Sequence, residues 1–148
     1  MTRIVFTRRL DAPIEIAWDM LTDPERMNAW SVAPVSSSAG TDPSVPGGER
    51  IVHVRRFGIR LKLREVTVVA DRPRRFRYRV RPNVIVRKHV AEQRMQPQGN
   101  FTLLEWEVDI RSWVPGLMPI LVGAMRAQLE ASLDQLEVVA RESSGSAT

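Results

Sequence analysis

Apolar residues near the C-terminus recur at helical spacing between residues 115 and 142. They follow one another in steps of three or four and therefore share one face of a helix: Met118, Leu121, Met125, Leu129, Leu133, Leu136 and Ala140. At ~1.5 Å per residue, a helix of this length runs roughly 40 Å, enough to cross a small domain. We expect Leu121, Met125 and Leu129 to be buried against a large apolar partner.

Alternating polar and apolar residues in the middle of the chain predict β-strands. In residues 59–70 basic side chains alternate with leucine, and in residues 75–81 arginine alternates with Phe76, Tyr78 and Val80. The predicted strands are residues 3–10, 49–57, 59–70, 75–81, 84–95 and 101–113. They predict an α+β fold, in which a curved antiparallel sheet of six to seven strands wraps around the long C-terminal helix.

Two short helices are predicted between the first two strands. Pro13 suits the first helical position. The next apolar residues share one helical face: Ile14, Ala17, Trp18 and Leu21. The sequence Thr22-Asp23-Pro24 ends this helix and starts a second one, which runs to Ala29 or Trp30. Residues 31–48 are rich in Ser, Pro and Gly without periodicity, which predicts a mobile loop.

The composition fits one domain. A chain of 148 residues buries roughly 68–70% of its unfolded surface and needs no metal or disulfide to fold. Cysteine is absent and only two histidines are present, which excludes thiol nucleophiles and cysteine–zinc sites. No signal peptide or membrane span is recognisable. We expect a cytoplasmic protein with one domain over residues 1–142, a disordered tail over 143–148, and no metal or cofactor.

The net charge of +5 is unevenly distributed. Residues 50–94 hold 15 of the 22 basic groups and only three acidic groups. Such asymmetry is typical of an anion-binding surface, although an arginine-rich source genome would produce the same bias. Nucleic-acid binding is disfavoured, because the aromatic residues of strand 75–81 alternate onto the face that the long helix covers. An acidic ligand group, an anionic carrier protein or a membrane surface suits these charges better.

Several local sequences carry a family resemblance. They are Asp11-Ala12-Pro13-Ile14-Glu15-Ile16-Ala17-Trp18, Leu21-Thr22-Asp23-Pro24-Glu25, Trp30, Glu65-Val66-Thr67, Arg72-Pro73-Arg74-Arg75-Phe76-Arg77-Tyr78-Arg79, His89-Val90-Ala91-Glu92, and Leu104-Glu105-Trp106-Glu107-Val108-Asp109-Ile110 before Pro115-Gly116. With the predicted element order, they resemble the SRPBCC (START-like, birch-pollen-allergen-like) superfamily, and most of all its polyketide cyclase/dehydrase group. The resemblance implies a helix-grip fold with a deep cavity between sheet and long helix, where a hydrophobic or aromatic molecule is held.

Large side chains on the predicted inner face are the candidates for lining this cavity. We expect Trp30 to close the mouth, Trp106 to form the floor and Tyr78 to supply a polar group. Four residues of the long helix would form the lid: Met118, Leu121, Val122 and Met125. The alternative for these four is ordinary core packing. The loop at residues 31–48 would act as a gate.

His53 and His89 are the first candidates for acid–base chemistry, because histidine titrates near neutral pH. The strands that contain them read equally well with either face inward, so alternation leaves both orientations open.

Glu65 is the third candidate. It continues the inward set of Leu61 and Leu63, whereas Val66 and Val68 place the other face inside, and a β-bulge near Glu65 would reconcile the two patterns. A buried Glu65 would need a partner such as an arginine or a tyrosine. The alternative that we favour is a surface glutamate paired with a neighbouring arginine.

Two functions follow from these residues and the resemblance. The first is binding of a hydrophobic or aromatic, lipid- or polyketide-like molecule. The alternative is a polyketide cyclase, aromatase or dehydratase that acts on a chain held in the cavity. Acid–base groups facing the cavity would favour the enzyme, and a wholly apolar lining would favour the binder. The sequence leaves the choice between monomer and homodimer open.

Overall fold

The computed structural model describes residues 2–38, 40–56 and 58–146. Within these ranges the elements are, in chain order, β1 (Thr2–Leu10), α1 (Ile14–Thr22), α2 (Pro24–Met27), β2 (Val35–Ser37), β3 (Glu49–Arg56), β4 (Ile59–Asp71), β5 (Arg75–Val80), β6 (Val86–Gln98), β7 (Phe101–Ser112) and α3 (Met118–Ser146). Phe57, predicted to end a strand, lies outside the described residues.

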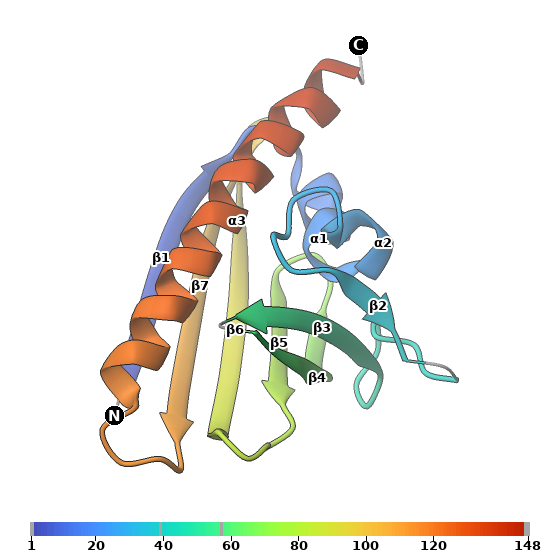
Figure 1. The fold of residues 1–148 in the computed structure, drawn as a ribbon. Coiled ribbons are helices and arrows are strands. Elements are labelled where there is room, and N and C mark those ends of the chain that lie inside the picture. Colours follow the sequence, from blue (N-terminus) through green and yellow to red (C-terminus); the bar gives the residue numbers. More distant parts are fainter. Residues whose placement is uncertain (1, 39, 57, 147–148) are drawn as a thin grey trace.

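The strands form one antiparallel sheet in the order β1-β7-β6-β5-β4-β3-β2. The sheet curves around α3, which lies along β1 and β7, while α1 and α2 pack at one end (Figure 1). The predicted helix-grip fold is confirmed.

Strand alternation builds the core as the sequence predicts. On β7 the even-numbered residues Leu104, Trp106, Val108 and Ile110 are buried, and the intervening residues are partly exposed. The edge-to-face contact between Trp18 and Phe76, with ring centroids 5.8 Å apart, holds α1 on β5. These contacts form a well-packed core between α1 and the sheet.

The long helix differs from its predicted position in both bounds and burial. It begins at Met118 rather than at 115, because Gly116 adopts a positive φ of 77° that ends the preceding loop. It continues to Ser146, so residues 143–146, predicted to be a disordered tail, are helical. Residues 147–148 lie outside the described part of the chain.

The apolar stripe of α3 is fully buried only in its second half, at Leu133, Leu136 and Ala140. Leu121, Met125 and Leu129, predicted to be buried, are half-buried. The physical reason is that these three side chains pack against the core on one side and line a cavity on the other.

Two local irregularities depart from the predicted strands. The loop at residues 31–48 contains β2, which pairs with β3 and forms the edge of the sheet. β6 begins at Val86 rather than at 84, because the Asn83 side chain accepts hydrogen bonds from the N–H groups of Ile85 (2.8 Å) and Val86 (2.7 Å) and makes a turn there.

Candidate functional site

A cavity of about 190 Å³ lies between the sheet and the first half of α3. Its helical wall is formed by Leu121, Ala124, Met125, Gln128, Leu129 and Ser132. Facing residues come from the sheet, from α2 and the segment after it, and from the β5–β6 loop: Met27, Trp30, Ser31, Val35, Arg50, Val52, Val54, Leu61, Leu63, Glu65, Tyr78, Ile85, Val86, His89, Trp106 and Ile110. Most of these side chains are apolar, so the few polar ones stand out.

Five of the seven predicted lining residues border the cavity: Trp30, Tyr78, Trp106, Leu121 and Met125. Met118 and Val122 do not; they pack against the core beside it. The expectation that Trp30 closes the mouth is wrong. Trp30 is only 2% exposed, its Nε1 donates to the Met20 carbonyl (2.8 Å), and its ring meets that of Trp106 edge to face at 6.2 Å. Trp30 is therefore part of the inner wall.

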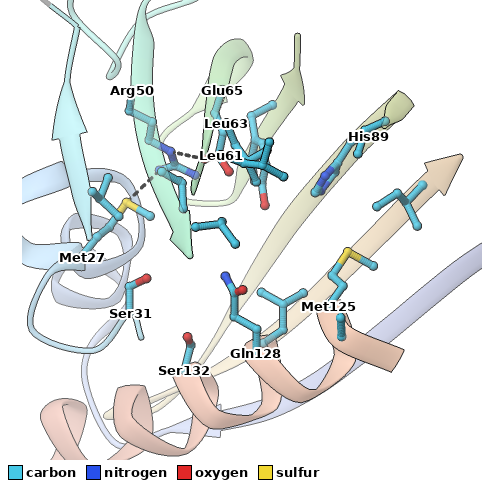
Figure 2. Close-up of a pocket in the computed structure, with 18 of the residues that line it drawn as sticks. Met27, Ser31, Arg50, Leu61, Leu63, Glu65, His89, Met125, Gln128 and Ser132 are labelled. Carbon is cyan, nitrogen blue, oxygen red and sulfur yellow. Dashed lines mark hydrogen bonds and ion pairs between the residues drawn. The ribbon is translucent and has the colours of Figure 1, made fainter. Parts of the chain in front are cut away.

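A buried ion pair faces the cavity from β3 and β4. Arg50 Nε donates to Glu65 Oε1 at 2.6 Å, and the two side chains are 2% and 8% exposed. Arg50 Nη1 also donates to the Leu21 carbonyl (3.2 Å) and contacts the Met27 sulfur (3.0 Å), as Figure 2 shows in part. Among the described residues, no hydrogen bond engages Arg50 Nη2 or Glu65 Oε2. One donor and one acceptor of the pair are therefore available to a bound molecule.

The inward position of Glu65 corrects the surface orientation that we favoured from the sequence. A bulge does interrupt β4, but between Thr67 and Val69 rather than at Glu65. Leu61, Leu63 and Glu65 consequently share the inner face without interruption.

Two aromatic rings surround the buried guanidinium. The Arg50 Cζ atom lies 4.9 Å from the ring centroid of Tyr78 and 5.1 Å from that of Phe76. Burial, and then the negative charge of Glu65, raise the pKa of the Tyr78 hydroxyl well above its usual value. Tyr78 is therefore a neutral hydrogen-bonding group in the cavity wall at physiological pH.

The structure places the two histidines differently: His89 lines the cavity and His53 does not. His89 on β6 points into the cavity, with its ring centroid 6.3 Å from that of Tyr78 (Figure 2). Burial lowers the pKa of His89 to about 4, and the nearby Asp109 charge opposes this only in part. His89 is neutral at pH 7.

His53 lies on the outer face of β3, where its Nε2 is 3.0 Å from the Ser36 hydroxyl. It borders a shallower hollow of about 390 Å³ with Val32, Pro34, Ala127 and Ala131. Val54 and Gln128 line both this hollow and the cavity, so the hollow is an outer groove that adjoins the cavity. His53 is thus outside the cavity.

One hydrogen bond joins the segment after α2 to the long helix beside this groove. The Val32 N–H donates to Ser132 Oγ at 3.1 Å, and Ser132 is buried. Residues 32–34 line the outer groove, and the gating role of the loop remains a prediction.

Comparison with protein families identifies the chain. The model of the family described as polyketide cyclase / dehydrase and lipid transport matches residues 1–141. The chain belongs to this family. The resemblance stated from the sequence is confirmed. No curated protein matches the chain.

Solved structures of other proteins show the same fold. A START superfamily protein from Mycobacterium smegmatis is 16% identical, with a TM-score of 0.79 over 95% of this chain and 97% of its own. A protein from Thermus thermophilus is 16% identical, with a TM-score of 0.78 over 97% of this chain and 99% of its own. CalU16 from Micromonospora echinospora is 24% identical, with a TM-score of 0.65 over 94% of this chain and 74% of its own. At these identities the likeness concerns the fold.

In this polyketide cyclase/dehydrase-family chain, the outer face of the sheet is partly neutralised by its own acids. Arg94 bonds Glu105 (2.5 Å) and Glu107 (2.8 Å), and Arg75 bonds Glu92 (2.6 Å). Hydrogen bonds from Arg3 and Arg94 lower the pKa of Glu107. No group of three metal-ligating side chains converges within the described ranges. The chemistry that the described residues offer is hydrogen bonding and proton transfer inside the cavity.

Proposed function

We propose that this protein binds a small hydrophobic or aromatic molecule in the cavity, with an uncharged polar group of that molecule bonded to the Arg50–Glu65 pair. The observation that carries this proposal is the pair itself: a donor and an acceptor turned towards a mostly apolar space. Ligand sites are usually apolar with a few polar groups that orient the ligand.

The size of the cavity sets the size of the enclosed part of the ligand. At about 190 Å³ it is somewhat larger than the engineered apolar cavity of about 150 Å³ that binds benzene. One or two fused aromatic rings fit such a space. A longer molecule would extend past Gln128 and Val54 into the outer groove.

The charge balance of the pair favours a hydroxyl or carbonyl over a carboxylate. Arg50 and Glu65 already neutralise each other, so a ligand carboxylate would add an unpaired charge to a buried site. A hydroxyl can donate to Glu65 Oε2 while it accepts from Arg50 Nη2, and a ketone can accept from Arg50. The expected class is therefore a neutral phenol, alcohol or ketone with an apolar body.

Three probes of similar shape test this proposal by thermal unfolding. Any molecule that binds the native state raises the melting temperature by mass action. We expect 2-naphthol to raise it most, naphthalene less, and 2-naphthoate least. A larger shift with 2-naphthoate would contradict the neutral-group argument, and no shift with any probe would contradict binding in the cavity.

A cyclase or dehydratase activity is the second candidate, because acid–base groups face the cavity. His89 is neutral and can accept a proton, and Arg50 can stabilise an enolate oxygen on the opposite wall. In an aldol cyclisation, His89 would remove a proton from the carbon between two carbonyls, and that carbon would form the new bond to a third carbonyl carbon. This bond closes the ring, the protonated His89 returns its proton to the new alkoxide, and loss of water from the resulting alcohol introduces a double bond.

Incubation with a synthetic poly-β-ketone chain tests this second candidate. Ring closure and dehydration produce an aromatic chromophore whose absorbance can be followed. The enzyme hypothesis predicts that the protein forms this chromophore and that His89→Asn slows its formation about 100-fold or more. The same variant should still bind 2-naphthol. Equal rates of chromophore formation with and without protein would contradict the enzyme hypothesis, and only the binding function would stand.

A further inference from the structure

One end of the molecule carries exposed apolar side chains that the cavity does not use. We define the apolar tip as Val84, Trp113, Val114 and Ile120, which are 83%, 58%, 42% and 63% exposed. Val84 lies in the β5–β6 loop, Trp113 and Val114 lie in the β7–α3 loop, and Ile120 lies in the first turn of α3. Large apolar side chains gathered on one surface mark an interaction site more often than scattered ones do.

Hydrogen bonds hold the two loops together as one surface. The Trp113 N–H donates to the Ile85 carbonyl (3.1 Å), and the Ser112 hydroxyl donates to the same carbonyl (2.6 Å). The Trp113 indole Nε1 donates to the Asn83 carbonyl at 3.1 Å. Figure 1 shows both loops at the same end of the sheet. The indole ring is therefore fixed in an exposed position with its polar group satisfied.

The charge around the tip is mainly positive. Residues 79–91 and 110–129, which contain the tip, hold six basic residues and no acidic residue. Two of the six, Arg81 and Lys88, are paired with Glu49 and Asp109 from outside these ranges, which leaves four unneutralised by those pairs. The Arg87 guanidinium lies over the Trp113 ring, with Cζ 5.9 Å from its centroid. A second copy of this chain would bring like charges together at this surface, whereas an anionic surface would complement them.

Apolar and basic groups occur together at the surfaces of proteins that bind membranes from one side. Tryptophan is enriched at the membrane interface, and arginine near it is attracted to anionic lipid. None of the helices in the described ranges is both long enough and apolar enough to cross a bilayer. Contact would be made by the two loops and the first turn of α3, where the exposed apolar side chains lie.

We propose that the apolar tip docks this protein on the surface of an anionic lipid bilayer. Trp113, Val84 and Ile120 enter the interfacial region, and Arg87 contacts lipid phosphates. The tip adjoins the cavity, because Ile85 lines the cavity wall while its carbonyl accepts the Trp113 hydrogen bond. Docking would thus place one end of the cavity close to the lipid. The docking does not depend on which molecule the cavity binds.

Intrinsic fluorescence gives a direct readout of this docking. Trp18, Trp30 and Trp106 are buried, at 4%, 2% and 3% exposed, so Trp113 is the exposed one of the four tryptophans. Insertion of Trp113 into lipid predicts a blue shift of emission, with the three buried rings as a constant background.

The experiment uses the full chain with vesicles of phosphatidylcholine alone or with about one third phosphatidylglycerol. We expect flotation with the anionic vesicles, a blue shift of emission, and weaker binding as salt rises. Trp113→Ser/Ile120→Ser should weaken binding by at least about tenfold, and Arg87→Gln by about fivefold. Trp113→Phe should retain most binding and lose the blue shift. The control Val45→Ser, which removes an exposed valine from the β2–β3 loop, should match wild type.

Three results would overturn the proposal. The first is no binding to either kind of vesicle. The second is binding without a Trp113 blue shift, or binding that Trp113→Ser/Ile120→Ser leaves unchanged, since both indicate adsorption through another basic surface. The third is binding to polyglutamate, used as an acidic protein surrogate, with no binding to anionic vesicles.

Discussion

Arg50 Nε and Glu65 Oε1 are joined by a 2.6 Å hydrogen bond inside the fold, where both side chains are almost completely buried. A buried ion pair is costly to desolvate, and removing one partner leaves the other charge without compensation. The stability and the binding properties of this protein therefore both depend on the pair.

Glu65→Gln should lower the free energy of unfolding by about 3–5 kcal/mol, because it leaves the Arg50 charge buried and unpaired. The double variant Arg50→Met/Glu65→Met should recover most of this loss, since it removes both charges. Urea denaturation of Arg50→Met, Glu65→Met and the double variant, each compared with wild type, measures the coupling. Asp19→Asn is the matched control, because its ion pair with Arg72 is exposed and is expected to contribute about 0–1 kcal/mol. Additive losses in the double variant would contradict the pairing.

Because of His89, the free energy of unfolding should decrease as the pH is lowered from about 6.5 to about 4. Its folded-state pKa of about 4 lies below the unfolded value of 6.5, so the unfolded chain binds the proton first. The stabilisation is complete above pH 6.5 and is lost as the pH falls through 4, by roughly 1–3 kcal/mol in total.

Urea denaturation at several pH values, compared between His89→Asn and wild type, checks this dependence. The difference between the two isolates His89 from the carboxylates that titrate in the same acid range. His53→Asn, outside the cavity, is the control and should keep the His89 contribution. A ring titration of His89 by NMR with a midpoint above 6 would show that the imidazole is not desolvated.

Two leucines on the same helix should differ sharply when replaced by alanine. Leu133 is fully buried, so Leu133→Ala should cost about 2–5 kcal/mol in urea denaturation. Leu129 lines the cavity and is half-buried, so Leu129→Ala should cost only about 1 kcal/mol. Equal losses at the two positions would mean that the first half of α3 packs directly against the sheet.

Periodicity along the chain was sufficient to predict the fold. The alternation on β7 and the stripe on α3 each specify an inner face without reference to the rest of the molecule. What periodicity could not predict is how closely two apolar faces approach. Leu129 and Leu133 have the same place in the pattern, yet one borders a cavity and the other is core.

The ion pair was missed because it depends on strand register. Arg50 and Glu65 are 15 residues apart and pair across the β3–β4 hairpin. The register was available in principle, because pairing Arg56 with Ile59 places Arg50 opposite Glu65. The orientation of His89 was less accessible, because a bulge between Val86 and Lys88 shifts the face of β6.

The most direct test of the account is the dissociation constant of 2-naphthol, measured by isothermal titration calorimetry with three proteins. Wild type should bind, and Met125→Trp should lose binding because the larger side chain fills the cavity. Glu130→Trp places the same side chain on the solvent-exposed face of α3 and should bind like wild type. Unchanged circular dichroism would show that all three proteins are folded. Equal affinity of Met125→Trp and wild type, or no binding by wild type, would contradict a ligand site between the sheet and α3.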